Sequence, residues 1–440
     1  MSRGQSVLEA HAKGESYAEA RLPDIVVFPE STADVQALMR FAHEHAVPVT
    51  PVAVNSSLEG HTVPLRGGIS LDLTRMNRIL EVAPDDLLVV TQPAVTYPHI
   101  NERVGRSGLF FPIDPGAHAS IGGMVSTNAS GTMAVRYGVT GDYVLGLEVV
   151  TPTGELIRTG SRARKSASGY NLNRLYCGSE GTLGVITEVT LKLVGLPEAA
   201  SAARVPFESV AAATAFVTSL IQAGLPVARC ELLDAQSVAA VNRFEGASYP
   251  EQTTIFLEFH GNPAGAEADA QLARELAEAQ GALSFEASSD PDERAKLWEA
   301  RHKLYYAVVA ANPGKRSFVS DVTVPISSLP EAVERALETC REQKLGVYVV
   351  GHVGDGNFHL TIFYKPGDQN ALSRTDRVSE MMIEHALSVG GTSTGEHGVG
   401  LRKLKYMRAE HGAALDVMWA VKHALDPKGI MNPGKKLPER

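Results

Sequence analysis

The sequence is poor in cysteine. Only Cys177, Cys230 and Cys340 occur in the 440 residues, and they lie far apart without a CxxC pair. Three distant cysteines give neither a disulfide framework nor a zinc ribbon, so we expect a reduced compartment. Long apolar runs are missing too: no stretch reaches the roughly 18 apolar residues of a membrane-spanning helix, and the start of the chain lacks the apolar core of a secretory signal. We therefore expect a cytoplasmic protein.

An excess of positive charge is also absent. Lys and Arg together number 41 against 50 Asp and Glu, which gives a net charge of −9. A groove that follows phosphates needs the opposite sign, so we expect no nucleic-acid partner. Hydrophobic residues make up 44% and charged residues 21% of the chain, as in ordinary globular proteins. The length favours two or three domains.

The common nucleotide-binding patterns are missing as well. No G-x-G-x-x-G lies between a predicted strand and a predicted helix, so a Rossmann nicotinamide site is not indicated. Gly429–Lys435 fits G-x-x-x-x-G-K, but Lys436 follows where a P-loop has Ser or Thr, and Pro433 lies inside the segment. We reject it as a P-loop.

The first half of the sequence alternates between helical and extended patterns. Ser31–Asp34 resembles a helix start, with apolar residues at helical spacing behind it. Residues 144–150 and 155–159 predict a hairpin around a Thr-Pro-Thr-Gly turn. Further strands are expected over 47–52, 69–73, 87–90 and 184–194. They are too short and too closely spaced for a βαβ repeat with long crossovers.

The composition changes at Gly195–Ala202, a stretch of Pro and small residues that we interpret as a domain boundary. Beyond it, Ala-rich helices alternate with strands. The helices are expected near 208–223, 263–280, 290–310, 327–343 and 370–390, and the strands near 227–233, 253–260, 317–324 and 346–364. This pattern predicts an α+β domain in which helices cover one side of an antiparallel sheet.

A predicted hairpin in the second half carries two histidines. Two apolar runs flank Gly354–Asn357, which has the composition of a four-residue loop. If Val353 pairs with Phe358, His352 lies opposite His359 on one face, with Cβ atoms about 4.5–5.5 Å apart. Two imidazoles so placed can bind one divalent metal ion. The alternative is that both are ordinary surface histidines.

A second polar pair lies in the tract Gly390–Gly400, which surrounds Glu396 and His397 with small residues. Such tracts usually present side chains or backbone to a ligand. Glu396 could complete a His-His-carboxylate site with an open position, as in catalytic metal centres. His397 would then remain as a base that titrates near neutral pH. In the alternative interpretation, these polar residues only satisfy backbone groups.

Glycine-rich loops also mark the first half of the chain. They cover residues 51–60, 114–123, 128–131, 136–138 and 178–184. Backbone amides in such loops can hold a pyrophosphate without a lysine.

Six segments, taken in order, resemble one family. They are Ser57–Gly60, Phe111–Gly116, Gly178–Gly184, His352–His359, Gly395–Gly398 and Asn432–Lys435. Together they resemble the FAD-dependent D-lactate dehydrogenases of the cytochrome type, within the vanillyl-alcohol-oxidase-like FAD superfamily. D-2-hydroxyglutarate dehydrogenases and the glycolate oxidase flavin subunit belong to the same group of D-2-hydroxyacid dehydrogenases. The resemblance extends over nearly the whole chain.

The resemblance implies an α+β fold with a two-subdomain FAD-binding domain of the PCMH type over residues 1–197. A cap domain with an antiparallel sheet covered by helices would follow over 198–415 and hold the metal site, and residues 416–440 would return to the FAD-binding domain. The implied activity is FAD-dependent oxidation of a D-2-hydroxy acid to the 2-oxo acid, with hydride transfer to flavin N5. D-lactate is the first choice, and glycolate or D-2-hydroxyglutarate are the alternatives.

The resemblance also implies roles for individual residues. Three of them would hold one zinc or manganese ion: His352, His359 and Glu396. His397 would be the base, and Asn357 joins the expected catalytic group. Arg301, which its helix alone would make an ordinary surface ion-pair partner, would bind the substrate carboxylate.

The FAD-binding residues that the resemblance implies lie in the glycine-rich loops. Residues 51–60 would wrap the pyrophosphate, and Pro115–Gly138 would line the flavin. The full set is Ala53, Val54, Asn55, Ser56, Ser57, Gly60, Pro115, Gly116, Ser120, Gly122, Gly123, Asn128, Gly131, Tyr137, Gly138, Glu180, Gly181, Gly184, Ile186 and Asn432.

The first of these loops departs from the family pattern. Ala53 and Asn55 stand where the family usually has glycine. Asn tolerates a left-handed backbone, whereas the same conformation costs Ala about 1–2 kcal/mol. Either the loop tolerates the change or FAD binding is weaker. No histidine lies in Ala53–Ser57, where covalent relatives attach their flavin, so we expect noncovalent FAD.

Besides its small 2-hydroxy acid substrate, such an enzyme needs an electron acceptor. The sequence leaves a quinone, a cytochrome and an electron-transfer protein equally open, and the acceptor could hold the protein at a membrane surface. A homodimer is also left open. Two rival functions stand beside this one: a flavin-free metal-dependent hydrolase, which leaves the glycine-rich loops unexplained, and a catalytically inactive FAD-binding subunit.

Overall fold

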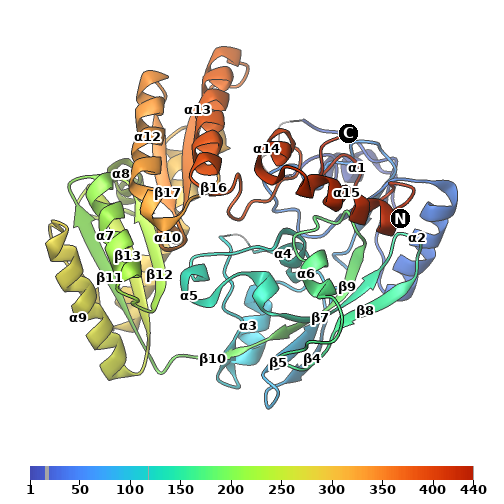
Figure 1. Ribbon diagram of the computed structural model, residues 1–440, viewed down its shortest axis with the longest axis horizontal. Helices are drawn as coiled ribbons and strands as arrows, with labels where there is room; N and C mark the ends of the chain where they lie inside the picture. Colours follow the sequence, from blue (N-terminus) through green and yellow to red (C-terminus); the bar gives the residue numbers. More distant parts are fainter. Residues whose placement is uncertain (15–18, 117, 440) are drawn as a thin grey trace. The chain divides into compact units, whose positions relative to one another are not determined.

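The computed structural model describes residues 1–14, 19–116 and 118–439. Contacts divide the chain into two compact units (Figure 1). The first unit comprises Met1–Gly131, Gly138–Leu196 and Glu396–Arg440, and the second comprises Thr132–Tyr137 and Pro197–Gly395.

This division differs from the expected boundaries at two places. The chain returns to the first unit at Glu396 rather than at residue 416, and Thr132–Tyr137 belongs to the second unit. Arg136 anchors the latter segment, since its Nη1 donates to the carbonyl oxygens of Pro226 and His260 at 2.7 and 2.8 Å.

The first unit contains a small parallel sheet in the order β1-β3-β2. β1 (Ile25–Val27) and β2 (Val49–Val52) both pair in parallel with β3 (Ile69–Asp72), and α2 (Thr32–His45) connects β1 to β2. A capping box of Ser31 and Asp34 begins α2, as the sequence predicts. The expectation that this region has no long crossover is wrong, because α2 joins two parallel strands.

An antiparallel sheet of five strands forms the other layer of strands in this unit, in the order β4-β5-β9-β7-β8. The predicted hairpin is confirmed, since β7 and β8 pair from Val150 and Leu156 onward. The strands of this sheet are β4 (Ile79–Ala83), β5 (Leu88–Thr91), β7 (Val144–Val150), β8 (Leu156–Gly160) and β9 (Val185–Lys192). Other elements of the unit are α1 (Gln5–Ala10), α3 (Tyr97–Gly105), β6 (Leu109–Phe110), α4 (Ile121–Thr127), α6 (Leu172–Tyr176) and β10 (Val194–Gly195).

The last segment of the chain is bonded firmly into the first unit. α14 (Met407–His411) and α15 (Ala414–Leu425) contribute to a small apolar core. The backbone N–H groups of Val399 and Gly400 donate to the carboxylate of Glu180. These bonds begin well before residue 416, which is why the return to this unit starts earlier than expected.

The second unit is built on a sheet of eight strands, and all its pairs are antiparallel. The order is β14-β11-β13-β12-β17-β18-β15, with β16 also paired to β18. The strands are β11 (Ala199–Phe207), β12 (Val227–Leu233), β13 (Thr253–Gly261), β14 (Glu286–Ser288), β15 (Arg316–Val319), β16 (Val322–Thr323), β17 (Val347–Gly351) and β18 (Asn357–Tyr364).

Helices cover both faces of this sheet, whereas we expected them on one. Phe207 packs against Phe216 of α7 with ring centroids 5.4 Å apart, and Phe207 lies opposite Thr253. Phe256 is three residues from Thr253 and so faces the other way, where it joins Trp298 of α10 in a second core. The helices are α5 (Ala134–Tyr137), α7 (Val210–Gln222), α8 (Ala235–Glu245), α9 (Pro263–Ala279), α10 (Pro291–His302), α11 (Leu304–Ala310), α12 (Leu329–Glu342) and α13 (Gln369–Ser388).

Other elements also differ from the expected ones. β11 occupies part of the interpreted linker, α8 was not expected, and the helix expected over 290–310 is divided into α10 and α11 at Lys303. β11 begins with Ala-Ala-Ser-Ala-Ala. Because alanine is depleted in strands, the sequence of this segment does not predict one. None of the described helices is both long and apolar enough to cross a membrane.

Candidate active site

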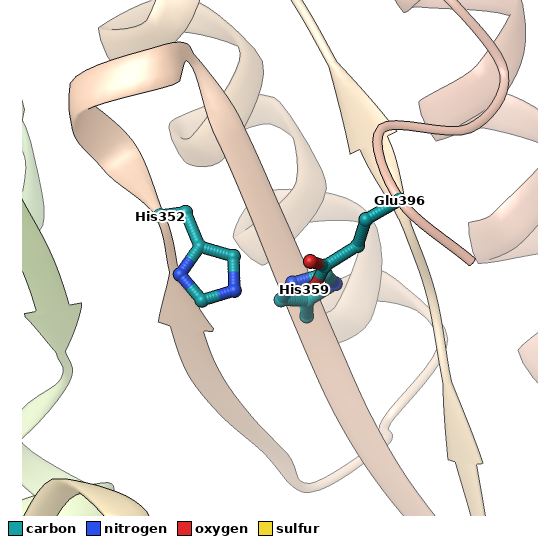
Figure 2. A group of neighbouring side chains, drawn as sticks. All are labelled: His352, His359 and Glu396. Atoms are coloured by element: carbon teal, nitrogen blue, oxygen red, sulfur yellow. The ribbon is translucent and has the colours of Figure 1, made fainter. Parts of the chain in front are cut away.

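Three residues that we predicted as metal ligands come together in the structure. His352, His359 and Glu396 each offer one ligand atom, and these atoms all lie within 4.8 Å of one another. Figure 2 shows the three side chains pointing toward one another. Glu396 follows directly on Gly395, the last residue of the second unit. No other such group of His, Cys, Asp and Glu occurs in the residues that the structure describes.

The hairpin that carries both histidines has a different register from the predicted one. β17 pairs with β18 so that Val350, not His352, lies opposite His359. His352 lies beyond the ladder and precedes a 3-10 turn at Val353–Asp355. The two rings nevertheless meet edge to face, with centroids 5.6 Å apart. The predicted cross-strand pair is therefore wrong, although the two rings do come together.

The strand register explains which side chains share this face of the sheet. Leu233, Val350 and His359 form one cross-strand row, and Glu231 lies two residues before Leu233 on the same face of β12. This is the face that α10 and α11 cover. Alternation along the strands therefore places Glu231 and His359 beneath the helix that carries Arg301.

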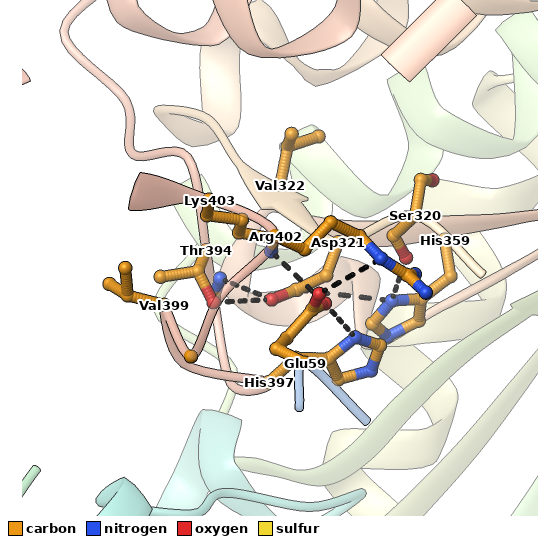
Figure 3. Close-up of polar contacts among 12 residues, drawn as sticks. Glu59, Ser320, Asp321, Val322, His359, Thr394, His397, Val399, Arg402 and Lys403 are labelled. Carbon is orange, nitrogen blue, oxygen red and sulfur yellow. Dashed lines mark hydrogen bonds and ion pairs between the residues drawn. The ribbon is translucent and has the colours of Figure 1, made fainter. Parts of the chain in front are cut away.

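His359 is held through its Nδ1 atom. Nδ1 lies 2.9 Å from the carbonyl oxygen of Ser320, which can only accept, so Nδ1 carries the hydrogen and the lone pair of the ring is on Nε2. Asp321 lies 3.9 Å from the same nitrogen and also accepts hydrogen bonds from the Thr394 hydroxyl and the Gly395 N–H (Figure 3). Asp321 thus fixes the backbone that leads to Glu396.

His352 is held by a carboxylate that the sequence did not reveal. Its Nδ1 lies 2.6 Å from Oε1 of Glu231, and Oε2 of Glu231 lies 2.7 Å from Nε and 2.6 Å from Nη2 of Arg301. Burial raises the pKa of Glu231, but His352 and Arg301 outweigh this effect, so the pKa lies below its ordinary value. The available signal was a single carboxylate inside an apolar strand, which needs partners when it is buried.

One edge of the Arg301 guanidinium is therefore occupied. Nε–H and one Nη2–H are directed at Glu231. A substrate carboxylate can then be bound only through the other edge, formed by Nη1 and the second Nη2 hydrogen. The side chain is 14% exposed. The predicted role of Arg301 thus requires end-on geometry.

Asn357, which we expected in the catalytic group, ties the hairpin to neighbouring strands. Its Nδ2 lies 2.8 Å from Oδ1 of Asp321, 2.9 Å from the Val322 carbonyl oxygen and 3.1 Å from Oγ1 of Thr323. Its Oδ1 is buried and has no hydrogen-bond partner among the described residues. The nitrogen is committed to the fold, so only the oxygen can serve a ligand.

His397, the predicted base, belongs to the first unit and lies beside a second buried carboxylate. Its Nδ1 is 3.4 Å from Oε1 of Glu59. Arg402 Nε and Lys403 Nζ lie 3.6 and 3.8 Å from oxygens of the same carboxylate (Figure 3). Burial raises the pKa of Glu59, but Lys403, His397 and Arg402 together lower it below its ordinary value. An ionised Glu59 can orient the His397 ring through Nδ1–H, which makes Nε2 the proton acceptor.

The donor set of the three grouped residues suits a divalent metal ion. Two imidazoles and one carboxylate leave coordination positions open, as catalytic centres require, and they select poorly between zinc and manganese. In both rings Nδ1 is held by an oxygen, which is how proteins orient metal-binding histidines. The residues present therefore fit a catalytic metal ion.

The predicted FAD-binding residues lie in loops, in helix α4 and in strand β9 of the first unit, with one exception. Tyr137 belongs to the second unit, where its hydroxyl lies 2.9 Å from Nδ1 of His260. Within the stretch from Pro115 to Gly138, Ala117 lies outside the described residues. The others occupy the loop after β2 (Ala53, Val54, Asn55, Ser56, Ser57, Gly60), the segment around α4 (Pro115, Gly116, Ser120, Gly122, Gly123, Asn128, Gly131, Gly138), the turn into β9 (Glu180, Gly181, Gly184, Ile186) and the C-terminal segment (Asn432).

Left-handed backbone marks these loops. Asn55, Asn128, Glu180 and Asn432 have φ values of 62°, 55°, 54° and 40°. Non-glycine residues adopt such values rarely, and those that do cluster at ligand-binding loops. Ala53 is not among the described residues with positive φ, so the strain that we considered for this alanine does not arise.

Ser57 provides a test of whether the first loop fits a cofactor. Its Oγ is buried and has no hydrogen-bond partner among the described residues. An unpaired buried hydroxyl costs about 1–3 kcal/mol, so a ligand with acceptor oxygens would stabilise it. A pyrophosphate supplies such oxygens, and the loop therefore fits FAD.

Two other predicted residues use their side chains within the protein. Glu180 accepts the N–H groups of Val399 and Gly400 at 2.8 and 2.9 Å. Asn432 donates from Nδ2 to the carbonyl oxygens of His61 and Glu180 at 2.9 and 2.8 Å. Their side chains hold the loops together, so they shape the predicted cofactor site from within.

Two family models match the chain. The FAD binding domain matches residues 23–160, and the C-terminal domain of FAD linked oxidases matches residues 196–436. Among solved structures, p-cresol methylhydroxylase with substrate bound has a TM-score of 0.81 at 16% identity, covering 99% of this chain and 93% of that one. The 4-ethylphenol oxidase from Gulosibacter chungangensis has a TM-score of 0.77 at 20% identity, covering 95% and 90%. These structures confirm the predicted α+β fold, and the family model over residues 23–160 supports its FAD-binding domain.

Several relatives match nearly the whole chain. It is 42% identical to a probable mitochondrial D-lactate dehydrogenase of Danio rerio, covering 99% of this chain and 89% of that protein. It is 39% identical to the mitochondrial D-lactate dehydrogenase (cytochrome) of Arabidopsis thaliana, covering 97% and 76%. The glycolate oxidase subunit GlcD of Bacillus subtilis is 33% identical, covering 94% and 89%. The chain therefore belongs to the family of FAD-linked oxidases, with FAD as its cofactor.

Proposed function

We propose that this protein oxidises a D-2-hydroxy acid, D-lactate before others, to the corresponding 2-oxo acid. The observation that carries the proposal is the group His352, His359 and Glu396, tied through Glu231 to Arg301 in an FAD-linked oxidase. A 2-hydroxy acid suits this combination, since a metal ion can coordinate its hydroxyl group and an arginine can form hydrogen bonds with its carboxylate. Relatives named D-lactate dehydrogenase, at 35–42% identity, support the same substrate.

Arg301 binds the carboxylate end of the substrate. Its end-on edge forms two parallel, charge-assisted hydrogen bonds with the carboxylate, while Glu231 holds the other edge. Because a guanidinium is planar, this pairing fixes the direction of the substrate as well as its position. Because the substrate loses its rotational freedom when it binds, this loss no longer adds to the activation barrier of the chemical step.

His397 removes the hydroxyl proton. The ring accepts it at Nε2, because Nδ1 faces Glu59. The Glu59 carboxylate then stabilises the positive charge that develops on the ring. His352, His359 and Glu396 would hold the metal ion, which would supply Lewis-acid polarisation of the hydroxyl. Bound FAD would supply the acceptor for the Cα hydride, so that the substrate would lose one proton to His397 and one hydride to FAD.

Noncovalent FAD and a zinc or manganese ion belong to the proposal. The loop Ala53–Ser57 contains no histidine that could carry a covalent flavin, and imidazole and carboxylate ligands suit either metal. The reduced flavin must pass its electrons to an acceptor. Relatives named D-lactate dehydrogenase (cytochrome) support a cytochrome in that role.

Glycolate is the second candidate substrate. Relatives named glycolate oxidase subunit GlcD, at 33% and 32% identity, favour it. Glycolate differs from D-lactate only by the Cα methyl group, so Arg301 and the metal ion would treat both alike. The flavin-free hydrolase loses its support, because the chain belongs to the FAD-linked oxidases.

Turnover by the FAD-loaded, metal-replete protein with an artificial electron acceptor tests the proposal. The panel contains D-lactate, L-lactate, glycolate and D-2-hydroxyglutarate. We expect the largest kcat/KM for D-lactate and little turnover of L-lactate, because a fixed carboxylate and hydroxyl allow only one enantiomer to present its Cα hydrogen. A preference for glycolate would change the substrate but not the reaction. A yellow protein that oxidises no member would contradict the proposal and support the inactive subunit.

A further inference from the structure

Glu231 is a buried carboxylate that joins two elements distant in the sequence. It lies on β12 with 0% exposed surface, and its oxygens meet His352 after β17 and Arg301 on α10. A buried ion pair of this kind persists only when its hydrogen bonds are well satisfied. Both oxygens of Glu231 have a partner, yet no step of the proposed reaction uses Glu231 directly.

The contacts of Glu231 determine the tautomer of His352 and the orientation of the Arg301 guanidinium. Because an ionised carboxylate can only accept, His352 must donate from Nδ1, and the lone pair of its ring must be on Nε2. The same carboxylate takes hydrogens from Nε and Nη2 of Arg301 at 2.7 and 2.6 Å. The planar guanidinium can then direct only its end-on edge elsewhere. One side chain thus sets both the ligand tautomer and the direction of the carboxylate-binding edge.

We propose that Glu231 is a positioning residue that couples the metal ion to the substrate carboxylate by fixing His352 and Arg301 together. The inference rests on the proposed function and deepens it. Its consequence is that one substitution at Glu231 weakens metal binding and substrate binding at the same time. Substitution of a group that hydrogen-bonds to a metal-binding histidine typically lowers metal affinity 10–100-fold.

Glu258 offers a matched control for a merely structural role. It is buried on the neighbouring strand β13, its Oε1 lies 2.6 Å from Nε2 of His260, and its Oε2 lies 3.7 Å from Nη1 of Arg229. It therefore shares burial, strand setting and partner types with Glu231. His260 is not part of the group that could hold a metal ion. The loss of a buried ion pair as such should affect both glutamates alike.

Glu231→Gln is the most informative variant, because glutamine keeps the shape but replaces one oxygen by a donor. If the amide oxygen stays with Arg301, the NH₂ group faces Nδ1 of His352, which must then accept. The ring hydrogen moves to Nε2, the atom with which the ring would bind the metal. If the amide turns round, its NH₂ group faces the donors of Arg301, and the guanidinium loses its orientation.

The experiment measures the metal affinity of the FAD-loaded protein by titration with Mn²⁺ and Zn²⁺ against a competing chelator. The proteins compared are wild type, Glu231→Gln, Glu231→Asp and Glu258→Gln. We expect the metal Kd to rise roughly 10–100-fold in Glu231→Gln, less in Glu231→Asp, and not in Glu258→Gln. Steady-state kinetics should show a higher KM for D-lactate in Glu231→Gln, with FAD content unchanged.

Each outcome decides the inference. A metal Kd for Glu231→Gln equal to that of wild type, or equal losses in Glu231→Gln and Glu258→Gln, would overturn it. If Glu231→Gln yields no folded, FAD-loaded protein, Glu231→Asp decides, since its shorter side chain cannot reach both partners; unchanged metal Kd and KM there would also overturn it. A wild-type protein that binds metal but oxidises no 2-hydroxy acid refutes the proposed function, and the metal comparison still decides on Glu231.

Discussion

His397 Nδ1 lies 3.4 Å from Oε1 of Glu59, a carboxylate from the opposite end of the sequence that is buried in the first unit. Arg402 and Lys403 lie within 4 Å of the same carboxylate, and they favour its ionised form. A carboxylate that orients one ring nitrogen prepares the other nitrogen to accept a proton. This pair supports the proposal that the adjacent residues Glu396 and His397 have different functions, as metal ligand and as base.

Variants of these two adjacent residues should separate the two functions. His397→Ala should keep the metal ion but slow flavin reduction by roughly 10²–10⁴-fold, the usual contribution of a positioned base. Glu396→Gln should instead lower metal occupancy, because one of three ligands is replaced. Metal analysis and anaerobic stopped-flow reduction by D-lactate measure both effects. Equal metal loss in the two variants would make His397 a ligand, and the base would have to be another residue.

Arg301→Lys should lower kcat/KM for D-lactate about 10–100-fold. Lysine keeps the charge, but a point charge cannot hold Glu231 and a substrate carboxylate through two separate edges. The loss of a hydrogen bond to a charged group amounts to roughly 1.5–3 kcal/mol, and about 1.4 kcal/mol corresponds to tenfold. Steady-state kinetics, with FAD content as a check, provide the measurement.

Arg294→Lys on the same helix is the control for that substitution. Among the described residues, the side chain of Arg294 makes one hydrogen bond, from Nη1 to the Ala200 carbonyl oxygen. It should leave kcat/KM nearly unchanged. Unchanged kinetics in Arg301→Lys would place the substrate carboxylate on another cation.

The loop after β2 predicts different results for substitutions at Asn55 and Ala53. Asn55→Ala should weaken FAD binding about 5–30-fold, because a left-handed backbone costs alanine about 1–2 kcal/mol. The variant also loses the hydrogen bonds of Asn55 with the Lys13 carbonyl oxygen and the Thr62 hydroxyl, at 2.9 and 2.6 Å. Ala53→Gly should change little, since Ala53 does not have a positive φ. FAD titration of the apoprotein measures both; much tighter binding by Ala53→Gly would mean that this position needs glycine after all.

His11 and Asp72 form an ion pair with 2.9 Å between Nε2 and Oδ2. The hydrogen bond to Asp72 raises the pKa of His11 above its ordinary 6.5. Burial raises the pKa of Asp72, but His11 and Thr74 outweigh this and lower it below 3.8. The stabilisation from His11 is therefore full below pH 6.5 and is lost as the pH rises through its folded-state pKa. The stabilisation from Asp72 is present above pH 3.8 and is lost as the pH falls through its folded-state pKa.

The His11→Gln substitution should consequently lower Tm more at about pH 6 than at about pH 8.5, where the histidine of the wild type is losing its charge. Thermal unfolding of both proteins at the two pH values measures the difference. The same decrease at both pH values would show that the charge on His11 does not contribute to stability.

Short motifs made most of the proposed site predictable. The two histidines flank a glycine-rich loop, and Glu396 and His397 lie in a tract of small residues, so local composition marked them. The cross-strand register was not predictable, because the ladder between β17 and β18 ends at Val350 and His359, and His352 precedes a 3-10 turn at Val353–Asp355. Loop composition fixes where a hairpin turns but not where its last pair forms.

Glu231 and Glu59 show what a local pattern cannot reveal. Glu59 lies in the segment Ser57–Gly60 and Glu231 lies in strand β12, but neither local pattern identifies the partners that the fold brings from other elements. The helices on both faces of the second sheet were missed for a related reason. Strands buried on both sides usually read as nearly continuous apolar runs. Here β12, β13 and β18 carry Glu231, Glu258 and His359 among their apolar residues, so they do not show that signal.

The most direct test of the central claim is anaerobic reduction of the bound flavin in a single turnover. Metal-replete, FAD-loaded wild-type protein is mixed with D-lactate or with L-lactate, and the flavin absorbance is followed until it is stable. We expect complete bleaching by D-lactate, little by L-lactate, and loss of the D-lactate reaction after the metal ion is removed by a chelator. A flavin that D-lactate does not reduce, or reduces equally fast without the metal ion, would contradict the proposed function.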